Sequence, residues 1–365
     1  MNARERFHAT CRFEPVDRAF RFETIGFWPE TIERWRKEGL PEEVEVISAY
    51  VHFGMDLRMP FFIGGGYDAG FVPAFEEKVI EESDEYRILR TTYGSVIKEF
   101  KGRQSTLPQF LEFPVRDMKT FEDIKWRLDP ATPERLGNWH QTAQLYNESD
   151  VPVYLYVCGL FGTARHLLGF DNLMFAYYDS PKLIHAIGEQ WVKLLTGVIE
   201  QMTASAKIDA IDFWEDMAYR NGPMIGPVLF REFMSPYYKR VIGCARSRGI
   251  EVFEVDTDGN IHTLIPLFLE VGVNKLLPFE VQAGMDIREV RKKYGKNLII
   301  EGGLDKRTLA LDFGAIREEV EFKVPMLLRD GGFFPAIDHY VPPDVSLENF
   351  EYFLKIVRDI GTGKR

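Results

Sequence analysis

Six short apolar runs that alternate with amphipathic segments constrain the fold more than any other feature of this sequence. The runs span residues 151–159, 208–217, 250–256, 274–280, 297–305 and 332–339. Between them lie segments with a 3.6-residue apolar period, such as 180–204 and 226–249, the second with a bend expected at Pro236. Strands that alternate with helices of this length predict parallel βαβ units.

The last five of these runs end in acidic, histidine or tryptophan side chains. In a (β/α)8 barrel the carboxyl ends of all strands meet at one rim, so five consecutive strands of this kind predict a ring of functional side chains around a mouth. Neither a G-x-G-x-x-G nor a G-x-x-x-x-G-K-[ST] loop follows a run. We therefore expect an α/β fold, namely a TIM barrel. The polar residues at its strand ends are Trp214/Glu215/Asp216, Asp256/Asp258, Glu280, Glu301/Asp305 and Asp338/His339.

The first 150 residues are less regular, but we expect residues 1–365 to form a single domain. Residues 19–28 predict the first strand, and 78–100 predict a β-meander with turns at Ser83-Asp84 and Tyr93-Gly94. We expect an insertion and a helical segment at about residues 75–150, with the hairpin lying over the barrel mouth.

Composition excludes several classes of function. The net charge of −11 and the lack of a Lys/Arg cluster argue against nucleic-acid binding. The three cysteines form no C-x-x-C pair, so a metal would be held by oxygen and imidazole ligands. No apolar window is long enough for a membrane span, and the N-terminus is charged where a signal peptide is apolar, so we expect a cytoplasmic protein.

The stretch Phe253–Asn260, FEVDTDGN, carries acids at every second position. It is not an EF-hand, because Ile265 stands where the bidentate Glu belongs. One of the acids could cap the following helix. Capping is a poor explanation for all three acids, since Glu254, Asp256 and Asp258 share one face of the strand. Carboxylates this close require a metal, a proton or a basic substrate.

The chain resembles the uroporphyrinogen decarboxylase superfamily, including its corrinoid-dependent methyltransferase branch, over nearly its whole length. The resemblance is carried by GLFGTARHLLG (159–169), WEDMAYRNGPMIGPVLFREFMSPYYKRVI (214–242), VDTDGNIHTLIPLFLEVGVN (255–274), EGGLDKRTLA (301–310) and DHYVPPDVSLEN (338–349). It implies a (β/α)8 barrel with the site at the carboxyl-end mouth, in agreement with the polar strand ends.

The resemblance leaves a decarboxylase interpretation open. Asp56 matches the catalytic Asp of the decarboxylases and His339 their conserved-motif His, although Asp56 could equally hold backbone amides. The Arg-rich segment that binds the polycarboxylate substrate corresponds here to FETIGFWPE (22–30), which has Glu23 and no arginine.

The methyltransferase branch fits better. Its zinc-binding His-x-Cys-Gly, Glu and Cys correspond here to Asp256-x-Asp258-Gly259, Glu280 and His339, or the neighbouring Asp338. The resemblance thus implies Asp258, Glu280 and His339 as zinc ligands without a thiolate, although His339 could instead be a hydrogen-bonded rim histidine. Asp256, Glu301 and, for the decarboxylase alternative, Asp56 are the catalytic candidates.

These residues suggest transfer of a methyl group from a small methylated donor, first of all a methoxylated aromatic, to cob(I)alamin. A Lewis acid or a protonated carboxyl would assist the leaving oxygen. Glu215, Asp216 and Glu301 would orient the donor, and the aromatic residues that could bracket its ring, or simply belong to the core, are Trp28, Phe161, Trp214, Tyr219 and Phe334.

The sequence has no Asp-x-His-x-x-Gly motif, so we expect the cobalamin to be carried by a separate corrinoid protein. A homodimer is a further expectation, and a non-catalytic ligand-binding barrel is the remaining alternative.

Overall fold

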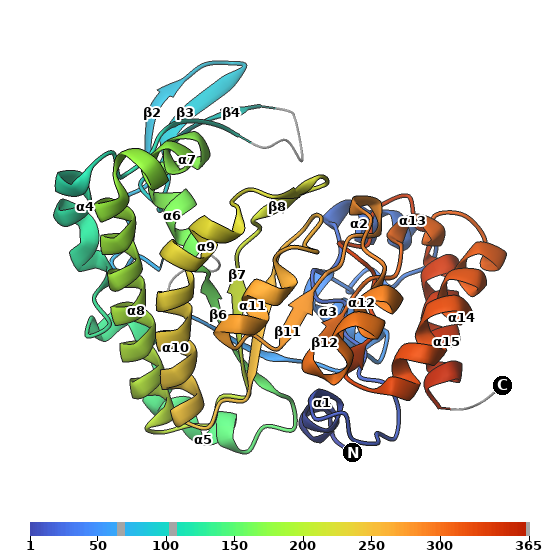
Figure 1. Cartoon of the computed structure of the whole chain (residues 1–365). Coiled ribbons are helices and arrows are strands. Elements are labelled where there is room, and N and C mark those ends of the chain that lie inside the picture. Colours follow the sequence, from blue (N-terminus) through green and yellow to red (C-terminus); the bar gives the residue numbers. More distant parts are fainter. Residues whose placement is uncertain (64–69, 102–107, 363–365) are drawn as a thin grey trace.

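The structure is a computed structural model that describes residues 1–63, 70–101 and 108–362. Its centre is a parallel sheet in which the strands follow the order β1-β6-β7-β10-β11-β12-β13 (Figure 1). These strands are β1 (Met59–Phe62), β6 (Val153–Cys158), β7 (Ala210–Trp214), β10 (Val252–Asp256), β11 (Lys275–Leu277), β12 (Ile299–Glu301) and β13 (Phe333–Phe334). All six predicted runs contain one of these strands, whereas β1 was not predicted from the sequence.

The segment 19–28 lies between the two edges of this sheet. The Arg21 carbonyl accepts a hydrogen bond from the Asp56 amide just before β1, and Gly26 and Trp28 exchange backbone bonds with Val341 after β13. Only Phe27 forms a bridge, so the predicted first strand is an irregular segment in the eighth position of the TIM barrel. Irregular backbone at this position is compatible with barrel closure because its polar groups still find partners on both sides.

Helices cover the outside of the barrel (Figure 1). They are α2 (Pro29–Lys37), α3 (Val46–His52), α4 (Met118–Ile124), α5 (Trp139–Asn147), α6 (Leu160–Leu168), α7 (Phe170–Asp179), α8 (Pro181–Thr203), α9 (Pro227–Phe233), α10 (Ser235–Ser247), α11 (Ile265–Val271), α12 (Ile287–Tyr294), α13 (Lys306–Leu309), α14 (Phe313–Asp330) and α15 (Leu347–Gly361). The predicted bend at Pro236 appears as the break between α9 and α10, because proline is favoured in a first helical turn and not inside a helix.

The barrel interior is layered. At its amino end, Phe7 of α1 (Ala3–Cys11) packs on Tyr154 and Phe334 and closes the barrel with an apolar layer. Above it Arg58, Glu254, Lys275 and Glu301 form a fully buried ionic layer. Side chains alternate along each strand, so Asp256 faces inward one layer above Glu254 on β10. Asp212 of β7, whose backbone pairs with that of Glu254, lies near enough for its charge to act on Asp256.

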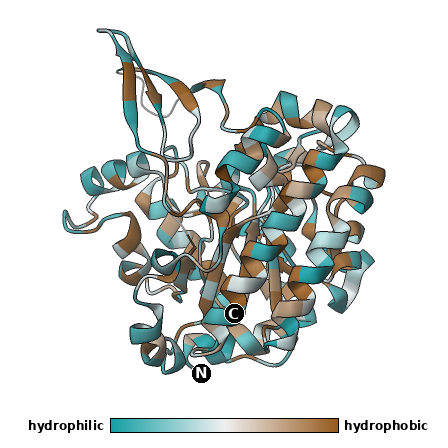
Figure 2. Ribbon diagram, turned by 90° about the vertical axis from the view of Figure 1, so that its left-hand side faces the viewer, coloured by the Kyte–Doolittle hydropathy of each residue, from teal (hydrophilic) through white to brown (hydrophobic). Residues whose placement is uncertain are grey.

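A second, antiparallel sheet projects from the body beside α6 and α7 (Figure 1; Figure 2). It consists of β2 (Lys78–Glu82), β3 (Tyr86–Arg90), β4 (Val96–Phe100) and β5 (Gln109–Glu112). The two predicted turns join β2 to β3 and β3 to β4, while β5 was not predicted. Tyr93, in the second turn, stacks on His166 of α6, so the insertion reaches the carboxyl-end rim of the barrel. The assignment of the whole chain to one domain stays a prediction.

Among the helices of the described residues, none combines the length and apolar character needed to cross a membrane.

Candidate metal centre at the barrel mouth

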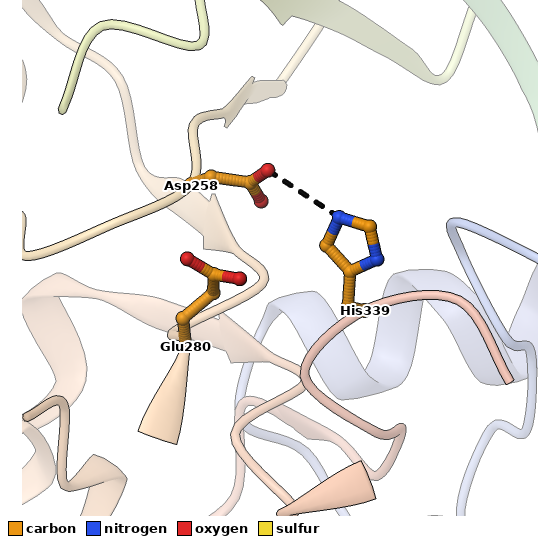
Figure 3. Close-up of side chains that lie close together, drawn as sticks. All are labelled: Asp258, Glu280 and His339. Carbon is orange, nitrogen blue, oxygen red and sulfur yellow. Dashed lines mark ion pairs between the residues drawn. The ribbon is translucent and has the colours of Figure 1, made fainter. Parts of the chain in front are cut away.

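Three side chains converge at the mouth, the rim formed by the carboxyl ends of the barrel strands (Figure 3). Asp258 follows β10, Glu280 follows β11 and His339 follows β13. One ligand atom from each lies within 4.8 Å of the others, and His339 Nε2 is 3.4 Å from Asp258 Oδ2. The side chains are 33%, 22% and 26% exposed, respectively, so the trio is accessible from solvent.

The loop after β10 is bound tightly to its neighbours. Gly259 has φ +80°, and a Cβ there would lie 2.7 Å from backbone atoms of Ala218 and Tyr219. Its amide donates to Glu280 Oε2 at 2.9 Å, which links the Asp258 loop to Glu280. The close approach explains why glycine follows Asp258, since any side chain would displace the loop.

Backbone strain occurs at two other places on this rim. Phe279, directly before Glu280, has φ +59°, and Asp216, after β7, has φ +43°. Left-handed backbone at residues other than glycine costs of order 1–3 kcal/mol and is concentrated at functional sites. Phe279 is the residue before Glu280, so one of these strained positions adjoins a residue of the trio.

Asp338 connects the elements that carry the trio. It is fully buried, and its two oxygens accept bonds from the amides of Val281 (2.8 Å) and Lys306 (3.0 Å). Val281 is the residue after Glu280, and His339 follows Asp338 itself. The Lys306 ammonium lies 3.7 Å from Glu280 Oε1. Asp338 therefore sets the relative positions of Glu280, Lys306 and His339 without facing the centre of the trio.

The trio has the properties required to hold a cation. Asp258 Oδ1 is buried and has no hydrogen-bond donor among the described residues. Oxygen and imidazole atoms about 2.1 Å from a zinc ion lie about 3.4 Å apart in a tetrahedron, which matches the separation of His339 and Asp258. Zinc is therefore compatible with these residues, and its assignment remains a proposal.

Further carboxylates surround the trio. Burial and the neighbouring Asp212, Asp258, Asp216 and Glu254 raise the pKa of Asp256 well above its usual value. Burial, followed by the charge of Asp258, raises the pKa of Glu280, although Lys306 and His339 oppose this. Carboxylates this close interact by repulsion, which a bound cation would relieve.

Aromatic and basic groups line two sides of the mouth. Arg165 donates to Asp216 and stands over the Trp214 ring at 4.9 Å, while His166 stacks on Trp214 at 5.3 Å. Burial, together with the Arg165 charge, lowers the pKa of His166 to about 4, so His166 is neutral at pH 7. On the other side Trp28 packs against Tyr340 with the rings 4.7 Å apart.

Three predicted site residues lie in the interior, away from the trio. Phe161 is buried in the core, and Glu215 is buried under α6, where its oxygens accept from the amides of Leu160 and Gly162. Glu301 belongs to the buried ionic layer, bonded to Arg58 and Lys275. Their contacts point to structural roles, because each carboxylate is already satisfied by protein donors.

Asp56 lies at the opposite end of the barrel. It precedes β1, is buried, and accepts from Arg6, from Arg18 and from the Arg21 amide. The basic side chains that a decarboxylase would need are present, but they enclose the Asp56 carboxylate. Its predicted catalytic role finds no support in this position.

Two aromatic candidates also differ from expectation. Phe334 lies in the apolar layer at the amino end of the barrel, whereas Tyr219 is exposed on β8 (Ala218–Tyr219), which pairs with β9 (Gly222–Pro223). Three residues near the trio, Lys306, Tyr340 and Arg165, were not predicted from the sequence as site residues. Tyr340 follows His339 directly, and Arg165 lies in the segment GLFGTARHLLG, so proximity to the candidate motifs was the available signal. Glu254, Asp256 and Asp258 do not cap the helix that follows them, because α11 begins only at Ile265 and has no side-chain cap.

Comparisons with known proteins agree with this architecture. Residues 99–360 match the family model described as uroporphyrinogen decarboxylase (URO-D). Curated uroporphyrinogen decarboxylases are similar: that of Hydrogenobaculum sp. (strain Y04AAS1) is 25% identical over 60% of this chain and 63% of its own length. That of Legionella pneumophila (strain Lens) is 22% identical over 69% and 71%. The chain thus spans less than two thirds of the Hydrogenobaculum protein.

The fold is also that of a solved methyltransferase from Methanosarcina mazei, with a TM-score of 0.65, 16% identity and coverage of 98% of both chains. At this identity the likeness shows the fold alone. The family model, in contrast, matches well over half of the sequence. The chain therefore belongs to the uroporphyrinogen decarboxylase (URO-D) family.

Proposed function

We propose that this protein is a methyltransferase that moves a methyl group from a small methylated donor, first of all a methoxylated aromatic, to the cob(I)alamin of a separate corrinoid protein. The observation that carries the proposal is the trio Asp258, Glu280 and His339, with a buried Asp258 oxygen that lacks a donor among the described residues. A buried carboxylate oxygen without a donor is a position that a bound cation can satisfy.

The chemistry requires help for the leaving oxygen. When the methyl group moves, the methyl carbon–oxygen bond breaks, cobalt(I) supplies the electron pair for the new cobalt–carbon bond, and the old bonding pair stays on oxygen. A zinc ion held by Asp258, Glu280 and His339 would supply the Lewis acid that stabilises this charge. Asp256, two residues before Asp258, is our candidate for proton donation to the oxygen.

The protein itself would position the donor. Trp28 and Tyr340 on one side and Trp214 on the other bring aromatic rings to the mouth, although His166 already stacks on Trp214. A methoxylated ring between them would be held by stacking while its oxygen faces the trio. The side chains of the trio are 22–33% exposed, which is compatible with a corrinoid partner that approaches from outside the barrel.

The test combines metal analysis with a transfer assay. We expect purified protein to contain about one zinc per chain. It should methylate a reduced corrinoid protein from at least one donor of a methyl-ether panel. Glu280→Ala and His339→Ala should each lose the metal and at least 100-fold of the rate, since each removes one ligand. Glu318→Ala and His140→Ala, at exposed positions on α14 and α5, serve as matched controls.

Decarboxylation is the second candidate, favoured by the names of the curated relatives. It predicts CO₂ release from a porphyrinogen by the wild-type protein without any corrinoid. Methyl transfer that persists in metal-free Glu280→Ala and His339→Ala would contradict the site assignment. No turnover with any methyl donor and no CO₂ release would leave a ligand-binding barrel.

A further inference from the structure

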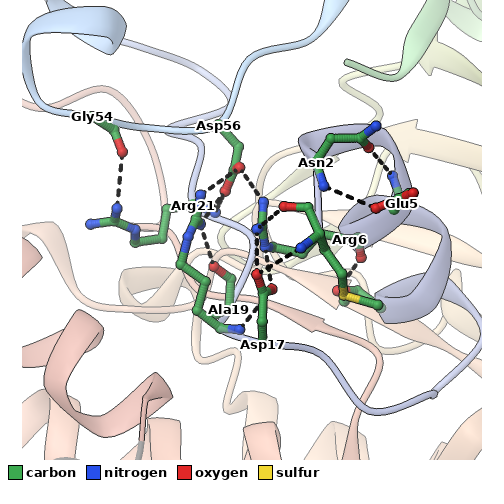
Figure 4. Close-up of polar contacts among 11 residues, drawn as sticks. Asn2, Glu5, Arg6, Asp17, Ala19, Arg21, Gly54 and Asp56 are labelled. Atoms are coloured by element: carbon green, nitrogen blue, oxygen red, sulfur yellow. Dashed lines mark hydrogen bonds and ion pairs between the residues drawn. The ribbon is translucent and has the colours of Figure 1, made fainter. Parts of the chain in front are cut away.

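A cluster of arginines lies at the amino end of the barrel, on the face opposite the mouth (Figure 4). Asp56 is saturated there: it accepts from Arg6 Nη1 (2.8 Å), from Arg18 Nη1 (2.6 Å) and Nη2 (2.8 Å), and from the Arg21 amide (2.9 Å). Asp17 is likewise bound by Arg6 Nε and Nη2, both at 2.8 Å. Neither carboxylate has capacity left for another guanidinium.

Arg21 is the cation that these acids leave unpaired. Arg21 is only 7% exposed, and its Nη2 donates a hydrogen bond to the Gly54 carbonyl at 2.9 Å. Its Nε and Nη1 are buried and have no acceptor among the described residues. A buried charge without a counter-charge costs several kcal/mol, and buried donors without acceptors add to that cost.

Like charges make the environment of Arg21 more unfavourable. Burial and the nearby Arg18 and Arg358, the latter exposed in the last turn of α15, lower the pKa of Arg21 to about 10, although the charge of Asp56 opposes this. Arg21 is nevertheless charged at pH 7. Among the described residues, the ion pairs of this cluster join Arg6 to Asp17 and Asp56 and Arg18 to Asp56.

A cavity lies next to the arginine segment, although none of the four arginines lines it. It has a volume of about 1000 Å³ and is lined in part by Ala19 and by Asp359, Ile360 and Gly361. Ala19 follows Arg18, and Asp359 follows Arg358. Gly361 packs against Ala19, so the last turn of α15 lies beside the arginine segment. The Arg18 side chain is 27% exposed and Arg358 is exposed, so a small ligand in solvent can reach the outer edge of the cluster.

We propose that Arg18, Arg21 and Arg358 form a binding site for a tetrahedral oxyanion, namely inorganic phosphate or the phosphate group of a small organic ligand. Guanidinium forks bind such oxygens with two parallel charged hydrogen bonds, which suits an arginine with two unused donors. The site would neutralise the excess positive charge of the cluster. It is independent of the metal centre and of the methyl transfer proposed above.

The experiment is calorimetric titration of the full chain with sodium phosphate and with phenyl phosphate, against sodium chloride at matched ionic strength. We expect saturable binding of at least one phosphate compound. Arg21→Met should weaken this binding at least 10-fold and Arg358→Met several-fold, whereas Arg116→Met, at an exposed position outside the cluster, should bind as the wild type does. Tighter binding of phenyl phosphate than of phosphate would identify the phosphate group of an organic compound as the preferred ligand.

Thermal unfolding provides a second measurement. Phosphate should raise the melting temperature of the wild type and not that of Arg21→Met. Without phosphate, Arg21→Met should melt no lower than the wild type, because it removes a buried charge that has no counter-charge. If Arg21→Met does not fold, Arg358→Met at its exposed position carries the test. The proposal is overturned if neither phosphate compound binds above chloride, or if the variant that folds binds as tightly as the wild type.

Discussion

Asp258 and His339 face each other across the barrel mouth, with His339 Nε2 3.4 Å from Asp258 Oδ2, although 80 positions of sequence separate them. They follow β10 and β13, and Glu280, which follows β11, completes the group. This geometry leads to predictions about the site and about the barrel that supports it.

Removing the buried carboxylate of Asp338 should weaken metal binding without removing a ligand. Asp338→Asn keeps one acceptor but places an amide donor opposite the Val281 or the Lys306 amide, so the Glu280 loop or α13 must shift. We expect a 10–100-fold loss of zinc affinity, measured by competition with a chromogenic chelator. Asp344→Asn, at an exposed position in the same segment, is the control. Equal affinity in Asp338→Asn and wild type would show that Asp338 does not position the site.

Glu301 should prove structural. Glu301→Gln leaves Arg58 and Lys275 sharing Glu254 as their one remaining partner within the buried ionic layer. We expect it to lower the free energy of unfolding by about 3–5 kcal/mol, measured with urea. A second change, Lys275→Met, restores charge balance and should recover part of the loss. If Glu301→Gln instead folds as stably as wild type but loses methyl transfer, the catalytic prediction for Glu301 gains support.

Stability should depend on pH through Glu23. Burial raises the pKa of this carboxyl to about 8, despite the bond it accepts from the Ile337 amide. The unfolded chain loses this proton near pH 4, while the folded protein keeps it up to about pH 8. The folded state therefore binds more protons between these values, and its stability should fall by up to about 1.4 kcal/mol per pH unit as pH rises through that window.

Glu23→Gln should flatten this pH profile, since the amide has no proton to lose and still accepts from Ile337. Urea unfolding at pH 5, 6, 7 and 8 measures the difference between variant and wild type. Glu77→Gln, an exposed change, should leave the slope unaltered. Parallel profiles for Glu23→Gln and wild type would mean that Glu23 ionises normally in the folded protein.

Glycine at position 259 should be essential for the metal centre. Gly259→Ala places a Cβ 2.7 Å from backbone atoms of Ala218 and Tyr219 on a residue with φ +80°. We expect a loss of stability of about 1–3 kcal/mol and a displaced Asp258 loop with reduced zinc content. Gly243→Ala, in α10 with no atom within 4 Å of the added carbon, should be neutral or stabilising by about 0.5–1 kcal/mol. Full zinc content in Gly259→Ala would show that the loop tolerates the shift.

Strand positions and the location of the trio could be predicted from the sequence because both are local patterns. Apolar runs bounded by polar residues identify β6, β7, β10, β11, β12 and β13, and the residue after each run must lie near the mouth. The strand β1 was missed because MPFF is short and lacks a polar ending. The segment 19–28 was predicted as a strand because many of its residues are apolar. In the structure its β-pairing is limited to the isolated bridge between Phe27 and Val341.

The sequence by itself determined the barrel, the inward face of FEVDTDGN and the convergence of Asp258, Glu280 and His339. It did not determine which acidic side chains are paired with basic side chains inside the protein. Glu254 and Glu301 lie one layer deeper than Asp256 and are neutralised by Arg58 and Lys275, and Asp56 is enclosed by Arg6 and Arg18. Only the tertiary structure decided this, because depth in the barrel and the cations across it come from strands far apart in the chain, whereas alternation along one strand reports only which way a side chain points.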